Sequence, residues 1–169
     1  MIKAVVYESH TGFTRKYAKI LGRMLDVPAY TIKEAERSLG SQSEVVFLGW
    51  ICAGKIMGYE QAARNFRIQA VGAVGILFTE DKTTQKLADD NRISHCPVFY
   101  LPGGYRHDQL GTVYRMMAKM ILSSMMNKRQ KTERDEVLIR VMREGADFVT
   151  VDNLEPVMHF IHACYEKAV

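Results

Sequence analysis

The amino-acid sequence predicts an α/β domain built around a doubly wound, five-stranded parallel sheet. Two observations lead to this prediction. Short runs of apolar and β-branched residues alternate with stretches of helical periodicity, and five such runs fall within about the first hundred residues. Strands that alternate with helices form parallel sheets, because each crossover is long enough to hold a helix. An eight-stranded barrel needs about 250 residues, so the 169 residues of this chain favour the open sheet.

Each predicted strand is a short run of mainly apolar residues. Continuous runs of this kind are typical of strands that are buried on both faces. Gly72 and Gly75 weaken the fourth run, and Pro102-Gly103-Gly104 ends the fifth. The five predicted strands are Ile2–Tyr7, Ala29–Ile32, Glu44–Trp50, Val71–Thr79 and Pro97–Leu101.

The predicted helices place apolar residues at helical spacing and charged residues on the other sides. In the last third, Thr132 followed by Asp135, or a cap one residue later, predicts a helix start, and Asp152 or Asn153 is the expected cap of the final helix. The predicted helices are Thr14–Leu25, Tyr59–Phe66, Thr83–Asn91, Asp108–Asn127, Thr132–Met142 and Leu154–Lys167.

The segment after the fifth strand is longer than one closing helix requires. We therefore expect a single domain over residues 1–169, with a helical insertion at about residues 106–150 beside the sheet or a site. The first helix of the insertion is rich in Met and carries an apolar stripe, which we interpret as core packing. The alternatives are a wall of an apolar cleft, a partner surface or a membrane surface. The stripe is Leu110, Val113, Met117, Met120, Ile121 and Ser124.

Composition is that of an ordinary globular protein. Apolar residues make up 47% and charged residues 25% of the chain, which excludes a disordered protein. No apolar run reaches the roughly 18 residues of a membrane span, and the N-terminus does not resemble a signal peptide. Cys52, Cys96 and Cys164 match no disulfide framework or metal motif, and we expect the last two in the core. We therefore expect a cytoplasmic protein without a metal site.

The segment between the first strand and the first helix carries the strongest functional signal. Ligands of doubly wound sheets bind at the carboxyl ends of the strands. Ser9, Thr11 and Thr14 bring hydroxyl groups to this position. Gly12 lets the backbone approach a ligand, and the following helix adds free N–H groups. These groups suit a phosphate, although the segment lacks the lysine of a Walker loop and the three glycines of a dinucleotide loop. An ordinary helix cap is the alternative.

The spacing Ser9-x-Thr11-Gly12-x-Thr14 after an N-terminal strand resembles the FMN-phosphate loop of flavodoxins. Leu48–Lys55 and Leu101–Tyr105 lie where flavodoxins place their second and third FMN loops. The resemblance covers residues 1–105 and about 150–169. It is greatest to the branch that includes menaquinone-dependent protoporphyrinogen dehydrogenase, in which a long helical insertion also follows a Gly-rich loop. It implies the strand order 2-1-3-4-5 and a noncovalently bound FMN.

The resemblance also implies which residues would hold the flavin. Trp50 and Tyr105 are the candidates for stacking on its ring, with a core position for Trp50 and a surface loop for Tyr105 as alternatives. Lys55, Arg106 and His107 would stabilise an anionic flavin or substrate if they lay beside it. No catalytic residue stands out. The expected cofactor-binding residues are Ser9, His10, Thr11, Gly12, Phe13, Thr14, Trp50, Ile51, Cys52, Ala53, Gly54, Gly103, Gly104 and Tyr105.

Three functions are consistent with these features. The first is electron transfer between FMN and a redox partner protein, which we favour. The second is a flavin-dependent dehydrogenase acting on a small anionic or aromatic substrate of the porphyrinogen or quinone type. The third is a non-redox phosphate-binding module.

Net charge bears on the partners. The chain has 23 Lys and Arg against 19 Asp and Glu, a net charge of +4, whereas carrier flavodoxins are usually acidic and dock on basic partners. Residues 1–80 carry ten basic and seven acidic residues, so three of these charges lie in the half with the proposed phosphate loop. We interpret the excess as attraction for an anionic cofactor, substrate or acidic partner, not for nucleic acid. We expect the basic run Lys128–Lys131 to be a solvated link, with peripheral membrane contact as the less favoured alternative.

Overall fold

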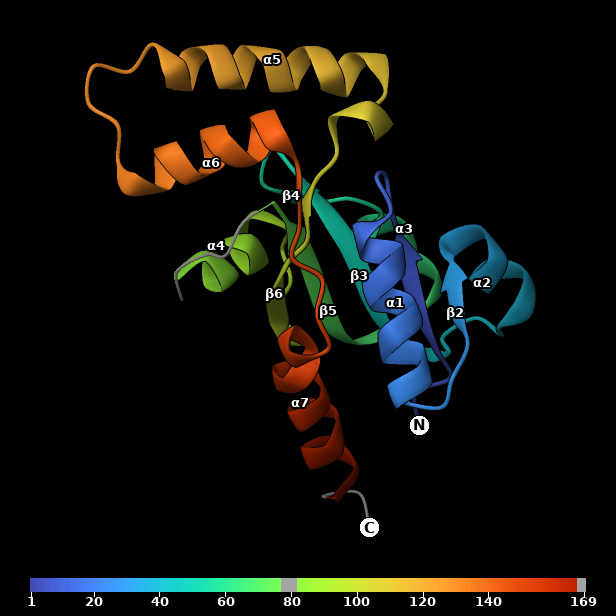
Figure 1. Ribbon diagram of the computed structural model, residues 1–169. Helices are drawn as coiled ribbons and strands as arrows, with labels where there is room; N and C mark the ends of the chain where they lie inside the picture. The colour runs from blue at the N-terminus through green and yellow to red at the C-terminus, as the bar shows by residue number, and fades with distance from the viewer. Residues whose placement is uncertain (77–81, 167–169) are drawn as a thin grey trace.

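The computed structural model, which describes residues 1–76 and 82–166, has an α/β fold with a mostly parallel central sheet (Figure 1). The predicted α/β class is confirmed, and the architecture is compatible with the flavodoxin resemblance. The parallel strands are β1 (Ala4–Glu8), β2 (Ala29–Thr31), β3 (Glu44–Cys52), β5 (Arg67–Gly75) and β6 (Val98–Pro102).

The order of strands in the sheet is β2-β1-β3-β5-β6. A short strand that the sequence did not predict, β4 (Lys55–Ile56), pairs antiparallel with the end of β3. The predicted order, 2-1-3-4-5, was for five parallel strands and did not include β4. The observed sheet differs from it because β4 adds to the end of β3. β5 begins at Arg67, before the predicted start, because its first residues pair with the beginning of β3. Residues 77–79 of the predicted fourth strand lie outside the described residues.

Helices cover both faces of the sheet, and each face has its own apolar core. α1 (Phe13–Met24) and α7 (Glu155–Glu166) pack on one face. The other face is covered by α2 (Ile32–Ser38), α3 (Tyr59–Asn65) and α4 (Lys82–Asp90). The strands between these layers are apolar on both sides, as their continuous apolar runs predict.

The sequence analysis missed α2. The Thr31 hydroxyl accepts a hydrogen bond from the Glu34 N–H at 3.3 Å, and the Glu34 carboxylate accepts one from the Thr31 N–H at 2.8 Å. This reciprocal capping box stabilises the helix start, and the pattern Thr-x-x-Glu is a signal that would have predicted it. Ile32, expected at the end of a strand, is instead the first residue of the helix.

The segment after β6 forms a helical hairpin that projects beyond the carboxyl edge of the sheet (Figure 1). Its helices are α5 (Thr112–Met126) and α6 (Glu133–Glu144), preceded by a short 3-10 turn, η1 (His107–Gln109). β7 (Gly104–Tyr105) and β8 (Ala146–Asp147) pair antiparallel and hold the two ends of the hairpin together. α6 begins with the predicted cap, because the Thr132 hydroxyl accepts from the Asp135 N–H at 3.1 Å.

A buried tyrosine joins three parts of the fold. The Tyr17 hydroxyl on α1 donates to the carbonyl of Pro102 at 2.6 Å and accepts from the Asn153 amide at 2.7 Å. Burial raises the pKa of Tyr17 to about 12, so its hydroxyl keeps the proton that it donates. Asn153 lies in the turn η2 (Asp152–Leu154) and bonds Tyr17 and the Phe148 carbonyl. The expected side-chain cap of the final helix is therefore wrong for Asn153.

We expect Tyr17→Phe to lower the free energy of unfolding by about 1–3 kcal/mol, because the Pro102 carbonyl loses its buried donor. Urea denaturation measures this change. Tyr30→Phe is the matched control, because the Tyr30 hydroxyl makes no hydrogen bond to any described residue and Tyr30 is only partly buried. Equal stability of the two variants would contradict the role assigned to Tyr17.

Candidate functional site

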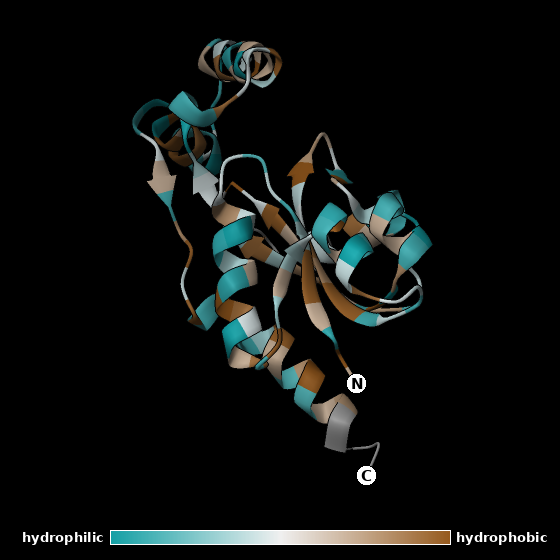
Figure 2. Cartoon of the chain, turned by 90° about the vertical axis from the view of Figure 1, so that its right-hand side faces the viewer, coloured by the Kyte–Doolittle hydropathy of each residue, from teal (hydrophilic) through white to brown (hydrophobic). Residues whose placement is uncertain are grey.

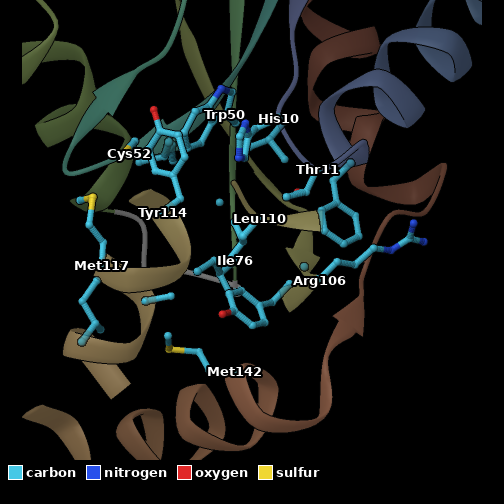
Figure 3. A pocket seen from close by; sticks show the side chains of 18 of the residues that line it. His10, Thr11, Trp50, Cys52, Ile76, Arg106, Leu110, Tyr114, Met117 and Met142 are labelled. Atoms are coloured by element: carbon cyan, nitrogen blue, oxygen red, sulfur yellow. The ribbon is translucent and has the colours of Figure 1, made fainter. Parts of the chain in front are cut away.

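A cavity of about 340 Å³ lies where the carboxyl edge of the sheet meets the helical hairpin (Figure 3). This volume is within the range of small-molecule sites. All three predicted loops contribute to the wall: Thr11 and Phe13 from the first, the range 50–53 from the second, and Tyr105 from the third. Parallel strands bring their carboxyl ends to one edge of a sheet, which is why segments far apart in the sequence meet here.

Val74, Gly75 and Ile76 at the end of β5 also line the cavity, as does Arg106. The hairpin supplies the rest of the wall, and the sequence analysis assigned none of its residues to the cofactor site. They are mostly apolar, and they close the side of the cavity opposite the sheet. Met117 and Ile121 belong to the stripe that we interpreted as core packing, and their position favours the alternative of a cleft wall. The hairpin residues are Leu110, Tyr114, Met117, Ala118, Ile121, Leu138 and Met142.

Three aromatic side chains from different elements meet at one end of the cavity (Figure 3). The rings of His10 and Trp50 stack, with centroids 5.1 Å apart and planes inclined by 23°. Tyr114 of α5 lies edge-on to both rings, at 4.7 Å from His10 and 5.1 Å from Trp50. One face of Trp50 is thus covered by His10, and the cluster joins the first loop to the hairpin.

A smaller space of about 200 Å³, which we call the hollow, lies beside the cavity at the first loop. Ser9, Gly12 and Arg15 line the hollow, while His10 and Thr11 line both spaces. Gly12 has φ of +94° and directly precedes α1, whose first N–H groups have no partner within the helix. Backbone N–H groups, the Thr11 hydroxyl and the positive charge of Arg15 can bind an anion there.

The three predicted hydroxyls differ in their surroundings. The Ser9 hydroxyl already accepts a hydrogen bond from the Arg15 N–H at 3.3 Å. Thr14 is only 1% exposed and lines the large cavity, not the hollow. Ser9 and Thr11 therefore both bring hydroxyl groups to the hollow, since the Ser9 hydroxyl still has its own proton to donate. Glu8 also lines the hollow and opposes an anion there.

The second predicted loop is a β-hairpin and not an open loop. Ile51 and Cys52 extend β3 and pair with Ile56 and Lys55 of β4. The turn residues have φ of +47° at Ala53 and +79° at Gly54, values typical of a tight hairpin turn. The segment expected as the second loop is therefore the end of β3 followed by a tight turn, because two more residues of β3 pair with β4.

Asn91 at the end of α4 holds the tip of this hairpin. Its side-chain oxygen accepts from the Ile56 N–H at 2.9 Å, and its amide donates to the Gly54 carbonyl at 2.9 Å. The Gly54 carbonyl therefore already accepts a hydrogen bond from Asn91. Gly54 does not line the large cavity. Of the predicted second-loop residues, Trp50, Ile51, Cys52 and Ala53 do so.

The glycines of the third predicted loop allow close packing. A Cβ atom on Gly103 would lie 2.6 Å from Cγ1 of Val74, and Gly103 does not line the cavity. Gly104, which does, has φ of +137°, and a Cβ there would lie 2.2 Å from the Ala146 carbonyl oxygen. Tyr105 is 6% exposed, and its hydroxyl lies 3.2 Å from Nδ1 of His107. A surface position for Tyr105 is therefore excluded.

Only one of the three predicted cations lines the cavity. Arg106 lies over the ring of Phe13, with its guanidinium carbon 5.3 Å from the ring centroid. Asp147 forms ion pairs with Arg106 and Lys16. Burial alone would raise the pKa of Asp147, but its hydrogen bond with Lys16 and the nearby cations hold it below its usual value. Lys55 instead donates to the Asp90 carbonyl at 2.6 Å.

The cysteines differ in their surroundings. Cys52 lines the cavity, and Cys96 packs against the core beneath α3, where burial raises its pKa to about 11. Cys164 is exposed, so its expected core position is wrong. No three His, Cys, Asp or Glu side chains group as a metal site within residues 1–76 and 82–166. Within the same ranges, every helix is too short or too polar to span a bilayer.

Comparison of the chain with protein-family models, with curated proteins and with solved structures gave no match.

Proposed function

We propose that this protein binds FMN noncovalently and transfers electrons through it. The observation that carries the proposal is the pairing of two spaces of different chemistry, which share His10 and Thr11. The hollow has the donors for a phosphate, and the cavity has the apolar and aromatic wall that a flat ring requires. FMN has a phosphate at one end and a flat aromatic ring at the other.

The residues present fit this cofactor. The Thr11 hydroxyl, the first N–H groups of α1 and Arg15 would hold the phosphate. Tyr105 and the end of β3 would contact the ring, and His10 would lie beside the chain that joins ring and phosphate. FMN supplies one- and two-electron redox chemistry when bound. The chain's own contribution is to bind the cofactor, exclude water from the ring and set the charge around it.

A dehydrogenase is the second candidate, and the hairpin is the observation that favours it. Leu110, Met117 and Met142 give the cavity an apolar wall opposite the sheet. A cofactor exposed only for electron transfer does not need such a wall, whereas a flat apolar substrate of the quinone or porphyrinogen type would pack against it. A non-redox phosphate-binding module would use the hollow alone.

FMN added to the purified protein is expected to bind saturably at micromolar concentration. Binding should quench both the flavin fluorescence and the emission of Trp50, the only tryptophan. Riboflavin has the same ring but no phosphate, so we expect it to bind about 100-fold more weakly, since charge-assisted hydrogen bonds each contribute about 1.5–3 kcal/mol. Titrations followed at both emission wavelengths measure these affinities.

Trp50→Phe is the control for the tryptophan signal, because it removes that emission while the flavin fluorescence still measures the affinity of the variant. Absence of FMN binding would contradict both redox functions, and equal affinity for riboflavin would contradict the phosphate site. Under anaerobic conditions, rapid turnover with a soluble quinone would favour the dehydrogenase. Reduction and reoxidation without such turnover would favour the electron carrier.

A further inference from the structure

The outer side of α5 is apolar and exposed. Val113, Met116 and Met120 are 63%, 60% and 67% exposed, and their spacing places them on one side of the helix. Ala118 and Met125, each 8% exposed, instead face the rest of the protein. α5 is therefore apolar on two sides, of which only one has a partner among the described residues. The expected core packing is wrong for Val113 and Met120.

The same helix and the turn after it contain only basic charges. Residues 109–132 have no Asp or Glu and five Lys or Arg. The rest of the chain has 18 basic and 19 acidic residues, so its net charge is 18 − 19 = −1, against +5 for this segment. The basic residues are exposed, and they are Arg115, Lys119, Lys128, Arg129 and Lys131. The largest basic excess is thus at the hairpin, and the first loop with α1 forms a second basic segment, since residues 9–25 have four Lys or Arg and no Asp or Glu.

Some of these basic side chains already form an ion pair or a hydrogen bond within the protein, and others do not. Lys128 pairs with Asp135 at 2.8 Å, and Arg115 donates to the Leu110 carbonyl at 3.0 Å. The Lys131 ammonium donates only to the carbonyl of Lys128, which leaves its charge without a counterion. No ion pair with a described residue involves Lys119, Arg129 or Lys131. These three charges are free to meet an external anion.

The position of α5 suits contact with a plane. It is the outermost element of the hairpin, at the end of the molecule away from both termini (Figure 1). In the side view the hairpin stands clear of the sheet, and apolar residues are spread over it (Figure 2). A flat surface can therefore reach the whole length of the helix without contact with the sheet.

We propose that the exposed face of α5 docks this protein on an anionic membrane surface, with the helix lying in the interface. Val113, Met116 and Met120 would enter the acyl boundary, while the basic residues meet anionic headgroups. A second copy is disfavoured, because it would bring two segments of charge +5 together. An acidic protein would satisfy the charges, but a single convex helix with flexible Met side chains offers no groove for one.

Docking would also place the membrane beside the cavity. Met117 and Ile121 line the cavity and are 37% and 50% exposed. They therefore join the docking face to the cavity wall. The docking itself does not depend on a bound flavin.

Cosedimentation of the full chain with lipid vesicles tests the proposal. Vesicles of phosphatidylcholine with about one third phosphatidylglycerol are expected to bind the protein, and vesicles of phosphatidylcholine alone to bind it much more weakly. Added salt should weaken the binding, because it screens the charges. The variant Lys119→Gln, Arg129→Gln, Lys131→Gln is expected to lower the partition coefficient by about 100-fold.

Two further variants test whether vesicle binding depends on the apolar face of α5 or is lost with any Met-to-Glu substitution. Met116→Glu with Met120→Glu should abolish vesicle binding, because it places carboxylates on the docking face. Met24→Glu is the matched control on α1, where Met24 is 39% exposed, and should bind vesicles as the unmodified protein does. Circular dichroism of each variant checks that it has the helix content of the unmodified protein.

Several results would overturn the proposal. One is equal binding to neutral and anionic vesicles, and another is binding that Met116→Glu with Met120→Glu leaves unchanged. Dimerisation in sedimentation velocity that the same variant abolishes, without vesicle binding, would assign the face to a second copy. Binding to poly-glutamate but not to vesicles would assign it to an acidic protein.

Discussion

Replacing Thr11 by aspartate is expected to weaken FMN binding by at least about 100-fold. Thr11 borders both the hollow and the cavity, so the new carboxylate would lie where the phosphate is proposed to bind. Two like charges about 4 Å apart near a protein surface repel by roughly 4 kcal/mol, which exceeds the loss needed for this effect. Titration of flavin fluorescence with Thr11→Asp measures the change.

Ser41→Asp is the matched control for charge. It adds the same carboxylate in an exposed loop before β3, at the opposite edge of the parallel sheet from the first loop. Solvent and salt screen charges at such a separation, so we expect FMN affinity to change by less than about twofold. Thr11→Asp should also affect riboflavin far less than FMN. Unchanged FMN affinity in Thr11→Asp would show that the phosphate binds elsewhere.

The substitution Gly104→Ala is expected to lower the free energy of unfolding by about 3 kcal/mol or more. The backbone of Gly104 has φ of +137°, which side chains rarely adopt, and the new Cβ would lie 2.2 Å from the Ala146 carbonyl oxygen. The contact belongs to the pair of β7 and β8, which holds the hairpin at its base. Urea denaturation of the variant measures the loss.

Gly40→Ala is the control for the removal of a glycine. Its Cβ would have Ser43 Oγ as nearest atom at 3.9 Å, and its φ is not positive. A glycine of this kind tolerates alanine, so we expect a change of no more than about 1 kcal/mol, of either sign. Similar stability of the two variants would mean that β7 and β8 separate at little cost, and that the hairpin is loosely held.

Local sequence signals predicted those elements whose structure depends on neighbouring residues. The continuous apolar run at β1 and the Thr132–Asp135 cap of α6 are examples, because burial on both faces and capping are local patterns. The turn at Ala53-Gly54 was missed. Its two positive φ angles are stabilised by the pairing of β3 with β4, and alanine is an unusual residue for that backbone.

The site divides in the same way. Residues after the ends of β1, β3 and β6 could be grouped in advance, because parallel strands end at one edge of the sheet. The aromatic cluster could not be predicted from the sequence. The stack of His10 on Trp50 and the contact of Tyr114 with both rings depend on the angle at which α5 crosses the carboxyl ends of the strands. Gly103 and Gly104 were expected to bind the cofactor, and the structure adds another reason for glycine there: both positions are closely packed, and Gly104 also has a positive φ.

The sequence by itself determined the α/β class, the glycine-containing loop before α1 and the purely basic composition of residues 109–132. Only the tertiary structure decided which apolar side of α5 is covered. A helical pattern shows that Val113 and Ala118 are both apolar, but not which of them meets a neighbour. That depends on where α6 packs, and the β7–β8 pair sets this position through contacts between residues far apart in the chain.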